Sequence, residues 1–145
     1  MTENHNDIAT SLRIFFEKYR DEIDMQGFST FPVNSCQGAS LLLGMMLQER
    51  SPSSQIDYVK GEDKNSFCHY WLEVDGLVFD ITADQFKDVG RTIYGETSQP
   101  LLARFPMLTR TTISEELLVS DITTQTYNNT MKVNLDLHLR SYDSI

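Results

Sequence analysis

The residue pair that most constrains this chain is Asp75-Gly76, which lies between two runs of alternating hydrophobic residues, "HYWLEV" and "LVFDIT". An Asp-Gly pair in this setting is typical of a two-residue β-hairpin loop, because a type I′ turn requires a positive φ at both central positions. If these two residues are the whole loop, Val74 lies opposite Leu77, and the register of both strands follows.

This register assigns each hairpin side chain to one of two faces, since residues directly opposite each other share a face. The face expected to pack on the core is mostly apolar and carries Cys68, Tyr70, Leu72, Val74, Leu77, Phe79 and Ile81. The other face carries His69, Trp71, Glu73, Val78, Asp80 and Thr82.

His69 and Asp80 are diagonal neighbours on the second face, with backbones about 7–8 Å apart, so an imidazole and a carboxylate can form a hydrogen bond there. Such a carboxylate fixes the tautomer and orientation of a catalytic histidine and leaves its other ring nitrogen for a nucleophile. The alternative is a solvent-exposed polar face on which the two residues merely lie near each other.

Two helices are expected before the hairpin. From Asp7 to about Asp24, apolar residues recur at spacings of three and four, which predicts an amphipathic helix with one buried stripe. A second helix, from about Cys36 to Arg50, is apolar nearly all round and should therefore be central and buried.

The remaining pattern favours an antiparallel sheet. Strands are expected near residues 55–60, 67–75 and 77–82. The alternating run "VNLDLHLR" predicts a late strand over 133–140, with His138 on its exposed face. The segment 83–120 shows no pattern that assigns its structure. The fold class is therefore α+β, with N-terminal helices packed on an antiparallel sheet in one domain over residues 1–145.

Cys36 is the candidate nucleophile because it opens the apolar helix. The unpaired N–H groups and the macrodipole at a helix N-terminus favour an anion such as a thiolate, and the same N–H groups could hold an oxyanion. The alternative is that Cys36 is a small buried hydrophobic residue. Cys68 adjoins His69 in a strand, so its side chain should point to the opposite face and lie in the core.

A cysteine at the head of a buried helix, followed by H-x-W-x-E-V, a Gly turn and D-x-T, resembles the transglutaminase-like branch of the papain-like cysteine enzymes. These elements lie within residues 30–86 of this chain. The resemblance implies a papain/transglutaminase-like core in which Cys36 is the nucleophile, His69 the general base and acid, and Asp80 the orienting carboxylate. The hairpin is also similar to the leader-peptide-cleaving proteins of lasso-peptide maturation.

The chain departs from this family at the second oxyanion donor. Papain-like peptidases usually place a glutamine a few residues before the cysteine, whereas the nearest upstream glutamine here is Gln26. Gln85 is a candidate for that donor, although a structural role at the turn after the strand is the alternative. Trp71 either lines a substrate groove or simply fills the core, and Asp84 is an alternative to Asp80 as the acid.

Composition excludes several other functions. A formal net charge of −9 and a pI near 4.6 argue against binding nucleic acid. No apolar run is long enough to span a bilayer, and the N-terminal residues lack a signal-peptide pattern, so we expect a cytoplasmic protein without a membrane partner. The two cysteines and three scattered histidines suggest no metal site, and nothing implies a cofactor.

The sequence therefore predicts thiol-dependent acyl transfer on an amide of a peptide or protein substrate, through a thioester. Transfer to water would make the protein a peptidase, an amidase or a glutamine deamidase, and transfer to an amine would make it a transglutaminase. Two alternatives stay open: a catalytically silent peptide- or protein-binding module on the same fold, and a toxin-like effector that modifies other proteins.

Overall fold

The computed structural model describes residues 4–23, 25 and 27–119, and it confirms the predicted α+β class. The described helices and strands are α1 (His5–Tyr19), α2 (Cys36–Arg50), β1 (Ile56–Glu62), β2 (Cys68–Val74), β3 (Leu77–Asp80), β4 (Ile93–Glu96), β5 (Met107–Thr112) and α3 (Ile113–Val119). Two short 3₁₀ turns, η1 (Phe28–Thr30) and η2 (Ala83–Gln85), lie in the connections. The strand predicted over 133–140, with His138, falls outside the described residues.

The first helix begins where Asn4 accepts a hydrogen bond from the N–H of Asn6. Its predicted apolar stripe is buried, but the predicted end near Asp24 is wrong because α1 ends at Tyr19. There the chain turns, with the N–H of Glu22 donating to the carbonyl oxygen of Tyr19, and Ile23 still reaches the core from this turn. The apolar spacing therefore continued past the point where the helix itself stopped.

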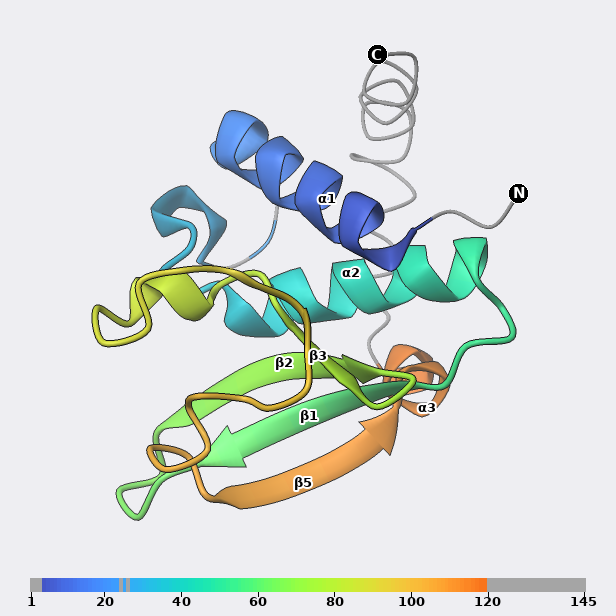
Figure 1. The fold of residues 1–145 in the computed structure, drawn as a ribbon. Helices are drawn as coiled ribbons and strands as arrows, with labels where there is room; N and C mark the ends of the chain where they lie inside the picture. Colours follow the sequence, from blue (N-terminus) through green and yellow to red (C-terminus); the bar gives the residue numbers. More distant parts are fainter. Residues whose placement is uncertain (1–3, 24, 26, 120–145) are drawn as a thin grey trace.

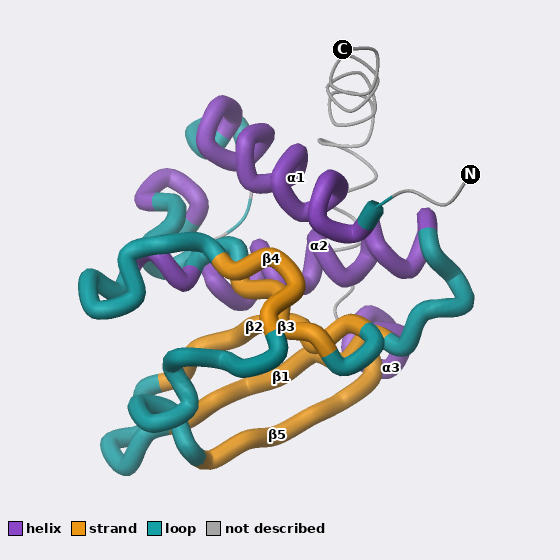
Figure 2. Tube along the Cα trace, in the orientation of Figure 1, coloured by secondary structure: helices purple, strands orange, loops and turns teal. Residues whose placement is uncertain are grey.

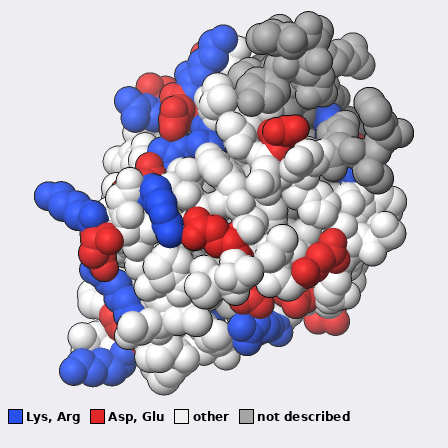
Figure 3. All heavy atoms as spheres, viewed as in Figure 1, with Lys and Arg blue, Asp and Glu red and all other residues white. Residues whose placement is uncertain are grey.

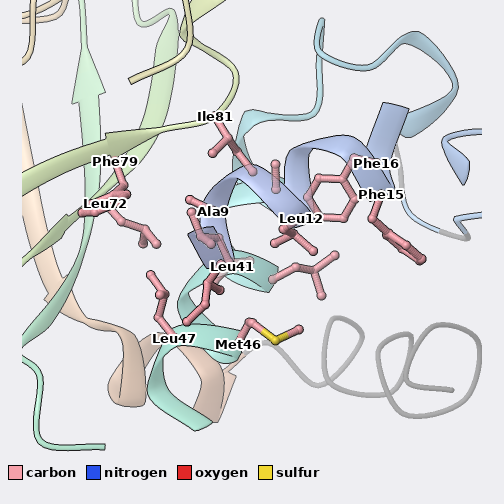
Figure 4. Close-up of a cluster of buried hydrophobic side chains, with 14 of the residues drawn as sticks. Ala9, Leu12, Phe15, Phe16, Leu41, Met46, Leu47, Leu72, Phe79 and Ile81 are labelled. Atoms are coloured by element: carbon pink, nitrogen blue, oxygen red, sulfur yellow. The ribbon is translucent and has the colours of Figure 1, made fainter. Parts of the chain in front are cut away.

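The second helix has the predicted bounds and the predicted central position. Figure 1 shows α2 between α1 and the sheet, running across one face of the sheet. Its buried residues occur on nearly every side, because one side meets α1 and the other meets the strands. Figure 4 shows this core, in which residues of the two helices gather with residues of the sheet and of the turn after β3. They are Leu12 and Phe16 of α1, Leu41 and Leu47 of α2, Leu72 and Phe79 of the sheet, and Ile81.

The strands form a five-stranded antiparallel sheet in the order β4-β3-β2-β1-β5. The predicted hairpin register is confirmed, since Val74 pairs with Leu77 and Leu72 with Phe79. Asp75 and Gly76 have φ values of 51° and 83°, as a type I′ turn requires. The backbone conformation that Gly76 supplies without a steric cost thus sets the pairing of β2 with β3.

The face of the sheet opposite α2 is also covered around β2 and β3, and this excludes the exposed polar face considered as an alternative. Val59, Trp71 and Val78 alternate with the residues that face α2, so they point away from the helices. A second, smaller apolar cluster covers them, supplied by Ala83, Ile93, Leu101 and Phe105. All four covering residues come from the segment 83–120, whose sequence showed no clear pattern.

Besides Tyr70, which is half-buried, two residues of the predicted core face are less buried than expected. Cys68 is only partly buried, because it opens β2 beside the turn at Asp63, where its sulfur lies near the carbonyl oxygen of Ser66. Leu77 is exposed because it directly follows the hairpin loop at the other end of the sheet. The alternation of faces is correct at both positions, but the helices do not extend over them.

The strands β4 and β5 form the two edges of the sheet, and Figure 2 shows β4 as a short strand beside β3. On the face drawn in Figure 3, acidic and basic side chains are interspersed, without one continuous patch of either sign. Within residues 4–119, apart from the two undescribed positions, no helix is long and apolar enough to cross a membrane.

Candidate functional site

The candidate residues lie at the end of the sheet where α2 begins, β2 begins and β3 ends. In Figure 1 the first turn of α2 lies over this end, and the segment after β3 passes beside it. Antiparallel pairing brings the start of β2 and the continuation of β3 together, so His69 and Asp80 are neighbours through local folding alone.

His69 and Asp80 form the predicted hydrogen bond, with Nε2 of His69 2.7 Å from Oδ2 of Asp80. Both side chains are only 1% exposed. The carboxylate has further donors: the side-chain amide of Gln99 donates to Oδ2 at 3.0 Å, and the N–H of Thr82 donates to Oδ1 at 3.2 Å. Because both oxygens are engaged, the carboxylate is fixed in orientation and presents an acceptor to His69.

Aromatic rings enclose the imidazole of His69. Phe86 meets it edge-on with ring centroids 5.0 Å apart, and Phe105 and Trp71 lie at 5.7 and 5.8 Å. Such packing limits the rotation of the ring and excludes water from the bond to Asp80. Low local polarity strengthens the interaction between the two groups.

The position of Cys36 follows from the way α2 runs along β2. The hydroxyl of Ser40 donates to the carbonyl oxygen of Tyr70 at 3.2 Å, and a Cβ built on Gly44 would lie 3.5 Å from Cδ2 of Leu72. One turn of helix and two residues of strand each advance the chain by about 6 Å. One turn before Ser40, Cys36 therefore lies at the start of β2, the end of the strand that carries His69.

The imidazole responds to both neighbours. Burial lowers the pKa of His69, but the charge and hydrogen bond of Asp80, followed by a hydrogen bond and the charge of Cys36, outweigh burial and raise this pKa to about 9. Nδ1 of His69 is buried without a regular hydrogen-bond partner. The two observations are compatible because the Cys36 sulfur lies close enough to act on the ring without a hydrogen bond of regular geometry. The histidine is thus bonded to Asp80 on one side and open to the thiol on the other.

The first turn of α2 is not capped by a side chain. Ser35 occupies the N-cap position, where a serine hydroxyl usually accepts from the helix N–H groups, but it makes no such bond. Its hydroxyl is buried and has no regular hydrogen-bond partner among the described residues. The N–H groups at this end of α2 are therefore left without a side-chain acceptor beside Cys36.

The other candidate residues are engaged elsewhere. Asp84 forms two hydrogen bonds with the guanidinium of Arg13, at 2.7 and 2.8 Å, and is thereby held toward α1. The side-chain amide of Gln85 donates to the carbonyl oxygen of Thr82, which is the structural turn role considered as its alternative. Trp71 is fully buried in the smaller cluster, beside His69, where it shields the His–Asp pair.

Sequence reasoning missed Gln99, Phe86 and Phe105, because all three come from the segment that showed no pattern. Gln99 lies in a loop, and only the tertiary fold brings its amide to Asp80. In the described ranges, no group of three or more His, Cys, Asp or Glu side chains could hold a metal ion. Comparison with known proteins adds nothing further: no family model, no curated protein and no solved structure matches the chain.

Proposed function

We propose that this protein catalyses thiol-dependent acyl transfer on an amide, with Cys36 as nucleophile, His69 as general base and acid, and Asp80 as the orienting carboxylate. One observation carries the proposal: a buried histidine is fixed by a carboxylate at Nε2, while its unpartnered Nδ1 is left to the thiol at the head of α2. A surface ion pair would need neither the burial nor the aromatic enclosure.

The reaction follows from the roles of these groups. The Cys36 thiolate attacks the amide carbonyl carbon, and the electron pair of the C=O bond moves to oxygen, near the uncapped N–H groups of α2. The C–N bond then breaks as His69 gives its proton to the leaving amine, and a thioester remains on Cys36. Water, activated by His69, cleaves the thioester in a peptidase, amidase or deamidase; an amine replaces water in a transglutaminase. We favour water.

The order Cys, His, Asp and the helix-on-sheet arrangement support a papain/transglutaminase-like core, with a peptide or protein as substrate. Similarity of the hairpin to lasso-peptide leader-cleaving proteins supports the same substrate class. Both described cysteines are free thiols, which is compatible with the reducing cytoplasm that we expect.

Alkylation of the two cysteines tests the proposal without a substrate. Iodoacetamide labelling, followed by mass spectrometry across pH 5–9, gives a rate for each thiol, and the half-buried Cys68 of the same molecule supplies the reference rate at every pH. We expect Cys36 to react below pH 7, and to slow at least about 10-fold in His69→Ala or in the larger His69→Gln, because the thiolate loses its cationic partner. Circular dichroism verifies that each variant is folded.

Two other results would point to the alternatives. A Cys36 that reacts only near the value of a free thiol, about pH 8.5, contradicts the proposal and favours a silent binding module. If expression is toxic and Cys36→Ala removes the toxicity, the chemistry stands and the protein is an effector that modifies other proteins.

A further inference from the structure

Tyr58 carries a buried polar group that the proposed reaction has not used. The residue is 4% exposed, and its hydroxyl has no regular hydrogen-bond partner among the side and main chains that the structure describes. Leaving a buried hydroxyl unpaired costs about 1–3 kcal/mol. A buried polar group without a partner is rare in folded proteins and calls for an explanation, of which a role in binding or catalysis is one.

The position of Tyr58 places this hydroxyl under the first turns of α2. Tyr58 lies on β1 opposite Leu72, so it shares the face of the sheet that α2 covers. Its ring stacks on that of Tyr70, with centroids 5.4 Å apart and an angle of 27° between the planes. The carbonyl oxygen of Tyr70 accepts from Ser40, one turn after Cys36. Tyr58 is therefore joined through Tyr70 to Ser40, which lies one turn after the candidate nucleophile on α2.

The electrostatic surroundings agree with this position. Burial is the largest cause that raises the pKa of Tyr58, and the negative charges of Tyr70, Glu116 and Cys36 raise it further. An interaction with the side chain of Gln37, which lies in the same turn of α2 as Cys36, lowers this pKa. Gln37 is close enough to influence the hydroxyl, yet no hydrogen bond of regular geometry joins them. With its pKa raised, the hydroxyl keeps its proton at neutral pH and remains a donor.

We propose that the Tyr58 hydroxyl donates a hydrogen bond to the acyl oxygen of a substrate bound at Cys36, and that Tyr58 is thus the second donor of the oxyanion site. The inference rests on the proposed function. It supplies the donor for which this chain has no glutamine just before the cysteine. A neutral tyrosine in a water-free site is well suited to this role, because it stabilises developing charge without carrying charge in the resting state.

In the reaction, the new bond joins the Cys36 sulfur to the acyl carbon, and the π electrons move to the carbonyl oxygen. That oxygen would then accept hydrogen bonds from Tyr58 and from the first N–H groups of α2. As the electrons return, the bond to the leaving group breaks, and the hydroxyl of Tyr58 retains its proton throughout. Tyr58 therefore stabilises the tetrahedral intermediate without transferring a proton.

Two reagents separate this role from activation of the thiol. Acylation of Cys36 by p-nitrophenyl acetate passes through an oxyanion and releases p-nitrophenolate, whereas alkylation by iodoacetamide displaces iodide and places no charge on a carbonyl oxygen. We expect Tyr58→Phe to lower the acylation rate by about 10- to 100-fold, as the loss of one oxyanion donor does. The alkylation rate and its pH profile should stay as in the wild type.

Two controls test whether the effect is specific to the Tyr58 hydroxyl and not a result of a changed fold. Tyr94→Phe, on β4, removes a half-buried tyrosine hydroxyl from another part of the fold and should change neither rate. The melting temperature of Tyr58→Phe should not fall, because the hydroxyl that it removes has no partner.

Four outcomes overturn the assignment of Tyr58. Equal acylation rates in the wild type and Tyr58→Phe overturn it alone, provided that Cys36 is alkylated below pH 7. A selective loss of acylation in Tyr70→Phe instead moves the donor to the neighbouring ring. An equal loss of both reactions in Tyr58→Phe shows that the residue acts on the thiol and not on the oxyanion. If Cys36 is not alkylated below pH 7 in the wild type, the proposed function fails and the assignment falls with it.

Discussion

Asp80 shows how strictly a single residue can be specified by its neighbours. Its carboxylate accepts from Gln99 and His69 at one oxygen and from the main chain of Thr82 at the other. A carboxamide at this position must direct its NH₂ group either at Gln99 and His69 or at the N–H of Thr82. Both orientations bring donor against donor, so the site requires a carboxylate rather than any side chain of the same shape.

We predict that Asp80→Asn slows the alkylation of Cys36 at pH 6 by at least about 10-fold, because the imidazole loses the charge that keeps Nε2 protonated. The rates of wild type and variant should approach each other at pH 9, where a thiol with the ordinary pKa of about 8.5 is largely ionised. Asp88→Asn is the matched control, since Asp88 is exposed and its ion-pair partner in the described part of the chain is the surface residue Arg104. An unchanged profile in Asp80→Asn would remove Asp80 from the site.

At the scale of elements, Arg13 connects α1 to the segment that follows β3. Its guanidinium donates to both oxygens of Asp84 and to the carbonyl oxygen of Ile81, and it lies over the ring of Phe31. Ile81 directly follows Asp80, so this contact also fixes the end of the strand that carries the acid. The side chain of Arg13 is 10% exposed, and that of Asp84 is 26% exposed.

Arg13→Met should destabilise the fold by about 2–4 kcal/mol, because it leaves Asp84 without its cation and the carbonyl of Ile81 without a donor. The expected loss lies below that of a fully buried pair, since water can reach part of the carboxylate. Denaturant unfolding of Arg13→Met, Asp84→Asn and the double variant gives the coupling free energy, which we expect to be about 1–3 kcal/mol.

Glu17→Gln is the control for this cycle. Glu17 bonds the same arginine from one turn further along α1, but its side chain is 55% exposed, so its loss should cost less than about 1 kcal/mol. If the cycle finds no coupling between Arg13 and Asp84, the bidentate pair does not hold α1 to the segment after β3.

Elements that are determined by their own residues and those next to them were predictable from the sequence. The hairpin register followed from Asp75-Gly76 and from alternation alone, and α2 followed from its apolar run. By contrast, β4 buries one residue of four, β5 buries none, and α3 has only seven residues. Such elements carry almost no hydrophobic period, because pairing with an existing strand or packing at its end determines them.

At the scale of the whole molecule, the same distinction decides which parts of the site were predictable. The bond between His69 and Asp80 was predictable because eleven residues and one tight turn separate them. Their burial was not, because it depends on Leu101 and Phe105, which return over the second face of the sheet from a segment without pattern. The neighbourhood of Cys36 was expected only through a family resemblance, since it depends on how a helix packs along a strand.

Burial of a cationic histidine makes the stability of the whole fold depend on pH. The pKa of His69 is raised to about 9 in the folded chain, from the value of 6.5 for a histidine without contacts. The folded state therefore binds the proton more tightly, and this stabilisation is complete below pH 6.5 and is lost as the pH rises through 9. A shift of this size corresponds to an upper bound of about 3 kcal/mol.

The measurement is made in Cys36→Ser, so that the thiol itself adds nothing to the pH dependence. In Cys36→Ser, where the contributions of Cys36 to the raised pKa of His69 are lost, we expect the free energy of unfolding to fall between pH 6.5 and 9 by about 1–2 kcal/mol, less than this upper bound. His69→Gln in the same background should remove that decline. His5→Gln should retain it, because the hydrogen-bond partners of His5 among the described residues are the uncharged hydroxyls of Ser51 and Ser54. A decline that persists without His69 would assign the pH dependence to other groups and would mean that Asp80 does not hold a proton on His69.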